Sequence, residues 1–124
     1  MQHPVVWFEV LGKDDSKLKT FYSELFDWKI DADNPERYGM VDTGSAEGIP
    51  GGIGPVSAGV RAGVTFYVHS DDPARSLERA QRLGGRVVMP ATQMKGGPLL
   101  AMFEDPEGHL IGLVKSGPKP TKAA

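Results

Sequence analysis

The chain has 124 residues, with 14 basic residues, 16 acidic residues, a formal net charge of −2 and no cysteine. This length suits one domain, or two small halves that share a core, and the near-balanced charge gives no field that would draw the chain to nucleic acid or to an anionic membrane surface. The missing cysteine excludes disulfide bonds and thiolate metal sites, and the lack of a membrane-length apolar run or a signal peptide layout leads us to expect a cytoplasmic protein.

The chain opens with the pattern of a strand followed by a helix. A β-branched and aromatic run begins at Val5, and alternation along it places Val5, Trp7 and Glu9 on one face. Asp15 is a candidate helix cap, and apolar residues recur from 18 to 26 at helical spacing. This segment carries the strongest helix signal of the sequence.

The next segments predict short strands and a connection between two halves of the chain. Residues 28–30 and 38–43 favour strands, with a loop at Asn34-Pro35 between them. Residues 44–63 are rich in glycine and contain two prolines, although residues 49–53 can still pair as an edge strand. We interpret residues 44–63 as the connection between two halves.

The second half repeats the order of elements. Residues 64–69 favour a strand, Asp71-Asp72-Pro73 supplies a helix cap with proline at the first helical position, and Gly84-Gly85 ends the helix. A strand over residues 86–89 is expected to end at Pro90.

A hairpin is expected at the end of the pattern. Residues 99–104 form its first arm, and Asp-Pro-Glu-Gly at 105–108 is a turn signal with proline at the second corner. In the second arm Leu110 and Gly112 share one face, while Ile111 and Leu113 share the other. We expect one of these faces to meet a helix.

The two halves match each other. Asp14-Asp15 and Asp71-Asp72 lie about 57 residues apart, which indicates an internal duplication of one β-α-β-β-β unit. We therefore expect an α+β fold in a single domain, residues 1–115, made of modules at about 4–55 and 62–115. Residues 116–124 lack an apolar pattern and are expected to form a flexible tail.

The order of elements and several motifs resemble the vicinal oxygen chelate superfamily, which includes glyoxalase I, extradiol dioxygenases and the bleomycin resistance proteins. The motifs that carry this resemblance are Phe21-Tyr22-x-x-Leu25-Phe26-x-Trp28, Leu83-Gly84-Gly85, and the final hairpin with Asp105-Pro106-x-Gly108-His109. The resemblance implies paired β-α-β-β-β modules that form a U-shaped, partly open barrel-like cleft. It also implies assembly as a homodimer.

Enzymes of this superfamily bind a divalent metal through His, Glu or Gln on inward strand faces, and the metal acts as a Lewis acid on the substrate. Carried onto this sequence, the ligand positions fall at Val5, Gly63, Gly112 and the Gly51-Gly52 region. None of these residues can coordinate a metal. The resemblance therefore implies a member without the usual metal site and without a cofactor, whose glycines leave room for a ligand.

The function expected from this departure is binding of a small, largely apolar molecule in a metal-free cleft, for sequestration or resistance. The residues expected to line the ligand site are Val5, Trp7, Glu9, Thr65, Tyr67, Met102, Leu110 and Gly112. A carboxylate at Glu9 would have a raised pKa if poorly solvated, or would pair with a basic ligand group.

Two alternatives remain open at this point. One is a lyase or isomerase of glyoxalase type, or an enzyme related to the dioxygenases, with Glu9 as the catalytic acid or base or with an atypical metal site. The other is an interaction module that catalyses nothing. His3, His69 and His109 are the only histidines. His3 could act as a metal ligand only if the strand register were shifted. Surface or turn roles are expected for His69 and His109.

Overall fold

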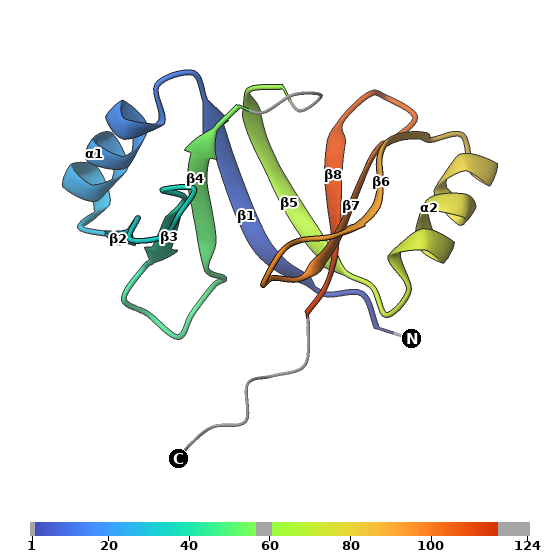
Figure 1. The fold of residues 1–124 in the computed structure, drawn as a ribbon, viewed down its shortest axis with the longest axis horizontal. Helices are drawn as coiled ribbons and strands as arrows, with labels where there is room; N and C mark the ends of the chain where they lie inside the picture. The colour runs from blue at the N-terminus through green and yellow to red at the C-terminus, as the bar shows by residue number, and fades with distance from the viewer. Residues whose placement is uncertain (1, 57–60, 117–124) are drawn as a thin grey trace, which may run out of the picture. The chain divides into compact units, whose positions relative to one another are not determined.

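The computed structural model describes residues 2–56 and 61–116. Over these residues the order of elements is β1-α1-β2-β3-β4 followed by β5-α2-β6-β7-β8 (Figure 1). The predicted α+β fold with two β-α-β-β-β modules is confirmed. Neither helix in the described ranges is long and apolar enough to cross a membrane.

The first module consists of β1 (Val5–Gly12), α1 (Asp15–Phe26), β2 (Lys29–Asp31), β3 (Gly39–Asp42) and β4 (Gly51–Pro55). The second module consists of β5 (Gly63–His69), α2 (Pro73–Arg82), β6 (Arg86–Gln93), β7 (Leu99–Glu104) and β8 (Leu110–Lys115). The described residues fall into two compact units, which are Val5–Phe66, and the residues from Tyr67 onward together with those before Val5.

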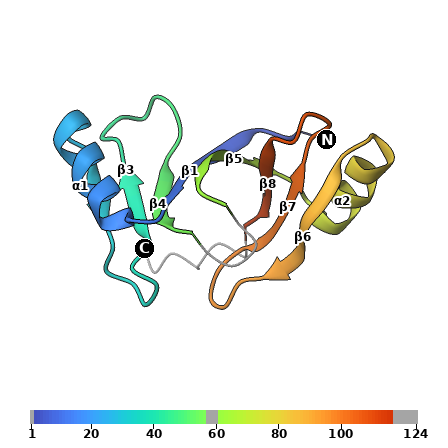
Figure 2. The same cartoon turned by 90° about the horizontal axis from the view of Figure 1, so that it is seen from above.

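The four strands of the first module have the order β2-β3-β4-β1. β4 pairs with β3 antiparallel and with β1 parallel, so the prediction of an edge strand over residues 49–53 is wrong. Ile53 on β4 is fully buried and Val41 on β3 is 4% exposed. Both lie on the sheet face that α1 covers (Figure 2).

Asp14, rather than Asp15, caps α1. The Asp14 side chain accepts a hydrogen bond from the backbone N–H of Lys17, and α1 begins at the next residue. Asp15 forms an ion pair with Lys19 one turn later, at 2.9 Å. The predicted cap was therefore wrong by one position, because either aspartate satisfies the same local pattern and only one has the non-helical backbone that a cap needs.

The four strands of the second module have the order β5-β8-β7-β6, with β7 and β8 joined as the predicted hairpin. α2 covers one face of this sheet, where Leu77, Ala101 and Leu113 form a buried cluster. The expected division of β8 into a helix-facing side and an opposite side is confirmed. Asp72 caps α2 and Pro73 opens it, also as predicted.

β6 is longer than its sequence pattern indicated. The strand continues through Pro90 to Gln93, with register shifts on either side of Met89. Because β6 is the outermost strand of its module and pairs only with β7, a proline that donates no hydrogen bond is tolerated there. The predicted end at Pro90 is therefore wrong.

Two predictions concern residues that the structure does not describe. The expected tail over 116–124 lies outside the described residues apart from Ser116, and residues 57–60 of the predicted connection between the halves lie outside them as well.

Candidate functional site

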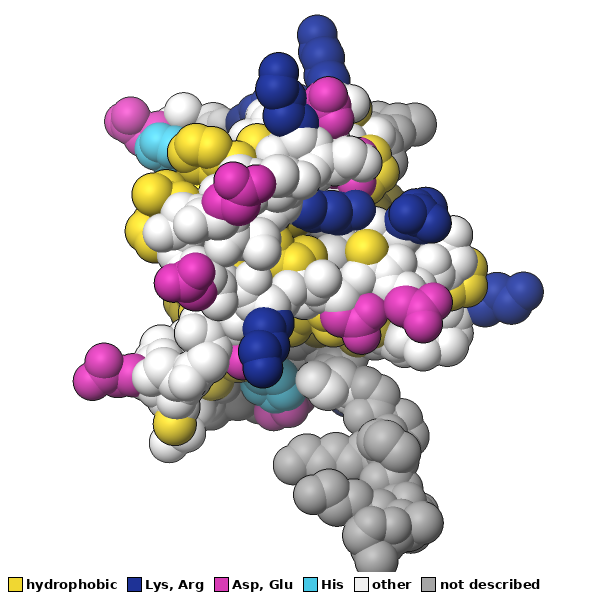
Figure 3. Space-filling model, turned by 90° about the vertical axis from the view of Figure 1, so that its left-hand side faces the viewer, with side chains coloured by type: hydrophobic (Ala, Val, Ile, Leu, Met, Phe, Trp, Pro, Cys, Tyr) yellow, Lys and Arg dark blue, Asp and Glu magenta, His cyan; other side chains and the backbone are white. Residues whose placement is uncertain are grey.

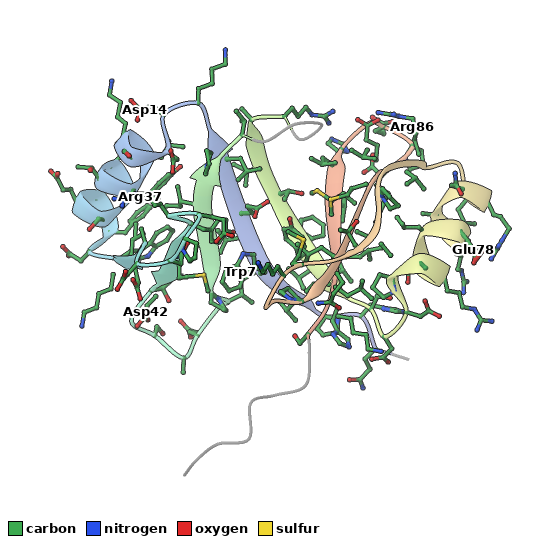
Figure 4. The ribbon with its side chains drawn as sticks, viewed as in Figure 1. Trp7, Asp14, Arg37, Asp42, Glu78 and Arg86 are labelled. Atoms are coloured by element: carbon green, nitrogen blue, oxygen red, sulfur yellow. The ribbon has the colours of Figure 1, made fainter. Side chains whose placement is uncertain are left out.

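The candidate site lies on the face of the first module's four strands that is opposite α1. Phe8 packs against Trp28 on the helix side, with ring centroids 5.6 Å apart and the ring planes tilted by 42°. Alternation along β1 then directs Val5, Trp7 and Glu9 to the other side, as predicted. Trp7 is only partly buried, whereas Glu9 is 8% exposed. Trp7 is labelled on β1 in Figure 4.

Tyr38 links these two side chains through hydrogen bonds. The indole Nε1–H of Trp7 donates to Tyr38 Oη at 3.1 Å, and the Tyr38 hydroxyl donates to Glu9 Oε2 at 2.8 Å. The indole nitrogen can only donate, so Tyr38 Oη accepts from Trp7, and its own proton is directed to the ionised Glu9 carboxylate. The result is an ordered Trp7–Tyr38–Glu9 row on one sheet face.

The position of Tyr38 depends on a loop and on two glycines. Asn34 holds the Tyr38 backbone at both ends, since its side chain donates to the Tyr38 carbonyl at 2.7 Å and accepts from the Tyr38 N–H at 2.8 Å. The Tyr38 ring then lies across β4, where a Cβ on Gly52 would be 1.9 Å from Tyr38 Oη and one on Gly54 would be 2.8 Å from the ring. Any larger residue at Gly52 would displace the ring.

The second module has a similar arrangement. Tyr67 on β5 is the cross-strand neighbour of Gly112 on β8, and a Cβ on Gly112 would lie 2.3 Å from the Tyr67 ring. Met102 is the neighbour of Gly112 on the other side and is 2% exposed. The expectation that glycines at the former ligand positions leave room for a ligand is therefore wrong at Gly52 and Gly112, because tyrosine rings occupy that space.

The eight predicted site residues fall into two groups, one in each compact unit. Val5, Trp7, Glu9 and Thr65 belong to the first unit, and Tyr67, Met102, Leu110 and Gly112 belong to the second. In the first group Trp7 and Glu9 are brought together through Tyr38. In the second group Tyr67, Gly112 and Met102 form one cross-strand row, and Leu110 pairs with Glu104 further along the hairpin.

The residues at the expected metal positions do not fit a divalent cation. No side-chain donor is present at any of these positions, which are Val5, Gly51, Gly52, Gly63 and Gly112, and an aromatic ring covers the backbone at Gly51, Gly52 and Gly112. Across residues 2–56 and 61–116, no three histidine or carboxylate side chains gather closely enough to hold a metal ion. The residues at these positions therefore do not fit the metal site that enzymes of the resembled superfamily use.

The histidines have structural roles in the described part of the chain. His3 Nδ1 lies 3.0 Å from the His69 carbonyl oxygen, and His69 Nε2 lies 2.9 Å from Asp71. His109 closes the hairpin turn, where its backbone N–H and its ring both contact the Asp105 carboxylate. The backbone N–H of His109 is the main cause of the lowered pKa of Asp105.

Sequence reasoning missed Tyr38, which it treated only as the start of a strand. Its partners lie 29 and 31 positions away, so local periodicity does not connect them. A usable signal was present in β4, where Gly52 and Gly54 share one face and leave a flat strip of backbone. Such a strip on a strand indicates that a large ring from a neighbouring segment lies across it.

Comparisons with known proteins agree with this fold. Residues 9–114 match the family model described as a glyoxalase-like domain. "Putative glyoxylase CFP32" of Mycobacterium tuberculosis is 30% identical over 115 residues, which is 86% of this chain and 43% of that protein. "Anthracycline biosynthesis protein DnrV" of Streptomyces peucetius is 26% identical over 127 residues, covering 90% of this chain and 46% of that protein. The chain thus spans less than half the length of these relatives.

Solved structures show the same fold at low sequence identity. A glyoxalase/bleomycin resistance protein/dioxygenase superfamily member from Vibrio splendidus 12B01 has a TM-score of 0.63 at 14% identity, covering 94% of this chain and all of that one. Methylmalonyl-CoA epimerase from M. tuberculosis has a TM-score of 0.64 at 18% identity, covering 93% and 89%. With the family match over most of its length, the chain belongs to the glyoxalase-like family of the vicinal oxygen chelate superfamily.

Proposed function

We propose that this glyoxalase-like domain binds a small, largely apolar molecule without a metal ion. The ligand lies on the sheet face that carries the Trp7–Tyr38–Glu9 row, and it stacks on the Trp7 ring. The role is one of sequestration or resistance rather than turnover. The residue chemistry at the expected metal positions supports a metal-independent mode, since none of them has a donor atom in its side chain.

The hydrogen-bonded row is the observation that carries this proposal. The bond to Tyr38 fixes the orientation of the Trp7 indole, which remains partly exposed. A ring that is already held in place loses little conformational freedom when a ligand stacks on it, so more of the stacking free energy appears as affinity. Glu9 at the far end of the row gives this face a polar end, which would favour a ligand with a basic or hydroxyl group.

The chain offers an internal reporter for ligand binding. Trp7 and Trp28 are its only tryptophans, and Trp28 lies on the opposite, helix-covered face. In a Trp28→Phe variant, all tryptophan fluorescence comes from Trp7. We would titrate this variant, freed of metal by chelation, with a panel of planar aromatic compounds that includes an anthracycline, because one relative is named for anthracycline biosynthesis.

The proposal predicts that at least one compound changes the Trp7 emission and raises the melting temperature of the wild-type protein. Replacing Trp7 with Leu should weaken the binding of that compound about tenfold, as expected for the loss of an aromatic stack, and calorimetry measures this affinity. The Trp28→Phe variant should bind like wild type. Binding that requires an added divalent ion, or that is unaffected by Trp7→Leu, would contradict the proposal.

A glyoxalase-like enzyme is the second candidate. The buried carboxylate of Glu9 beside a tyrosine hydroxyl favours it, because such a pair can hold and release a proton. The glyoxylase name of the mycobacterial relative points the same way. Turnover of the hemithioacetal of methylglyoxal and glutathione that is abolished in Glu9→Gln, with the fold intact by circular dichroism, would establish this candidate.

A further inference from the structure

The loop between β2 and β3 leads directly into Tyr38, and its backbone is unusual at that point. Arg37, labelled in Figure 4, has a φ of +55°, in the left-handed region that residues other than glycine rarely adopt. The Arg37 N–H donates to the Asn34 carbonyl oxygen at 2.9 Å, which closes a turn just before Tyr38. The left-handed residue therefore sets the direction in which the chain enters Tyr38.

Lys19 on α1 holds the carbonyl group of this left-handed residue. Its Nζ donates to the Arg37 carbonyl oxygen and, at 2.9 Å, to Asp15 Oδ2 one turn earlier on the helix. Only 15% of the Lys19 side chain is exposed, so most of it is withdrawn from water. A Cβ on Gly39 would lie 3.0 Å from Lys19 Cε, so the stem passes close to the start of β3. Lys19 thus contacts the chain on both sides of Tyr38.

The neighbouring lysine of α1 has a different environment. α1 lies on the side of the molecule that Figure 3 shows, where acidic and basic side chains are interspersed over the surface. Lys17 is exposed there, and its side chain forms no ion pair in the part of the chain that the structure describes. Lys19 instead has two acceptors. A charged donor on the carbonyl group of Arg37 offsets part of the free energy that a left-handed backbone costs.

We propose that Lys19 is a positioning residue of the ligand site and acts on Tyr38 through the Arg37 carbonyl group. Asn34 bonds both backbone groups of Tyr38, and the Lys19 bond ties this turn to α1. The Tyr38 ring is thereby directed to the place where its hydroxyl accepts from the Trp7 N–H. Without this anchor the turn leaves its left-handed form more often, and the Trp7 indole loses its fixed orientation. The effect on ligand affinity rests on the proposed function, whereas the positioning of Trp7 does not.

Proton exchange at the Trp7 indole tests this role without a ligand. Lys19→Met keeps an unbranched stem of similar length and removes the ammonium donor. The Trp7 Nε1–H should then exchange with water about fivefold faster by nuclear magnetic resonance, the factor that corresponds to the loss of one hydrogen bond. Backbone N–H groups of β4, which lies between two strands, report the stability of the whole module and should change less. Lys17→Met is the matched control, with the same charge change on the same helix, and should leave the Trp7 rate as in wild type.

A second substitution tests whether the effect passes through the Arg37 backbone. Arg37→Asn introduces a residue that adopts the left-handed form more readily than arginine does. In the Lys19→Met background it should return the Trp7 exchange rate toward the wild-type value. The proposal is overturned if Lys19→Met leaves this rate unchanged, if it raises the rate no more than at β4, or if Arg37→Asn restores nothing.

Ligand affinity separates this inference from the proposed function. For any compound of the aromatic panel that binds, Lys19→Met should weaken binding by about the factor seen in Trp7 exchange, because the loosened ring must be ordered again when the ligand stacks on it. Unchanged affinity together with faster exchange would refute a role of Lys19 in the ligand site. If no compound of the panel binds, the proposed function fails, and the exchange rates still decide whether Lys19 positions Trp7.

Discussion

The hydroxyl group of Tyr38 lies 2.8 Å from Oε2 of Glu9, and the two residues are separated by 29 positions in the chain. Tyr38 precedes β3, and its ring crosses β4 over Gly52 to reach Glu9 on β1. One side chain thus spans three segments of the first module. The same hydroxyl also accepts from Trp7, so the aromatic residue proposed to meet a ligand and the buried carboxylate of Glu9 both bond to a single oxygen atom.

The first prediction concerns the loss of the Tyr38 hydroxyl oxygen. Tyr38→Phe keeps the ring over Gly52 but leaves the Trp7 N–H and Glu9 Oε2 without this partner. We expect the free energy of unfolding to fall by about 1–3 kcal/mol, because two hydrogen bonds at part-buried atoms are lost, and urea denaturation at neutral pH measures this change.

Tyr22→Phe is the matched control for this loss. The Tyr22 ring stacks on Trp28, but its hydroxyl makes no hydrogen bond within the described residues. This substitution should change the free energy of unfolding by less than about 0.5 kcal/mol. Equal effects of the two substitutions would mean that the Tyr38 hydroxyl contributes nothing specific.

The features that sequence reasoning predicted correctly are those set by local pattern. The β7–β8 hairpin follows from two apolar runs around Asp-Pro-Glu-Gly, and the helix-facing side of β8 follows from the two-residue period of a strand. The cap of α2 at Asp72 was also predictable, because Pro73 fixes the first helical position. In α1 no proline follows Asp14 to mark the first helical position. The local sequence therefore does not decide whether Asp14 or Asp15 is the cap.

The features that it missed depend on long-range packing. The glycines of β4 are typical of a weak edge strand in the sequence. In the structure β4 lies between β1 and β3, and its glycines make room for the rings of Phe8 and Tyr38. Glycine at Gly112 likewise indicated open space, whereas the ring of Tyr67 fills it. In each case the missing side chain makes room for a ring from another strand, and that partner is not visible from the glycine's own neighbours.

A substitution at this contact gives the second prediction. Gly52→Ala would place a Cβ 1.9 Å from Tyr38 Oη and 2.1 Å from Cζ, so the ring must move and both of its hydrogen bonds must lengthen or break. We expect a loss of about 1–3 kcal/mol in the free energy of unfolding, the usual cost of overpacking. Gly97→Ala is the control, because its Cβ would lie 3.4 Å from the nearest atom.

The combination of these two changes is more informative than either alone. Gly52→Ala and Tyr38→Phe both remove the hydrogen bonds of the same oxygen, so the double variant should lose less stability than the sum of the single losses. The cycle is measured by urea denaturation of the four proteins. Strict additivity would show that Gly52→Ala acts without disturbing the Tyr38 hydroxyl.

The helix caps give the third prediction. Asp14→Ala and Asp72→Ala each remove the side-chain acceptor of a backbone N–H in the first turn, at Lys17 and at Arg75. Each should cost about 1 kcal/mol of stability. Asparagine at either position retains the accepting oxygen, so Asp14→Asn and Asp72→Asn should stay close to wild type. An alanine variant as stable as its asparagine counterpart would contradict the assignment of that cap.

The hairpin turn gives a prediction about pH. Asp105 accepts hydrogen bonds from the backbone N–H groups of His109 and Glu107 and from the His109 ring, and these bonds hold its pKa below the ordinary value of 3.8. A carboxyl group whose pKa is lower in the folded than in the unfolded chain stabilises the fold above the unfolded pKa. This contribution is lost as the pH falls through the folded pKa.

The difference in stability between wild type and Asp105→Asn should therefore shrink as the pH falls below the ordinary aspartate value. Urea unfolding of both proteins across the acidic range measures this difference, and carbon-13 chemical shifts of the Asp105 carboxyl group report its pKa directly. Asparagine cannot titrate, but it retains an acceptor oxygen, so the comparison isolates the charge. A difference that does not shrink below the ordinary aspartate value would mean that the folded turn does not favour the ionised carboxyl group, and the hydrogen bonds from His109 would then not lower its pKa.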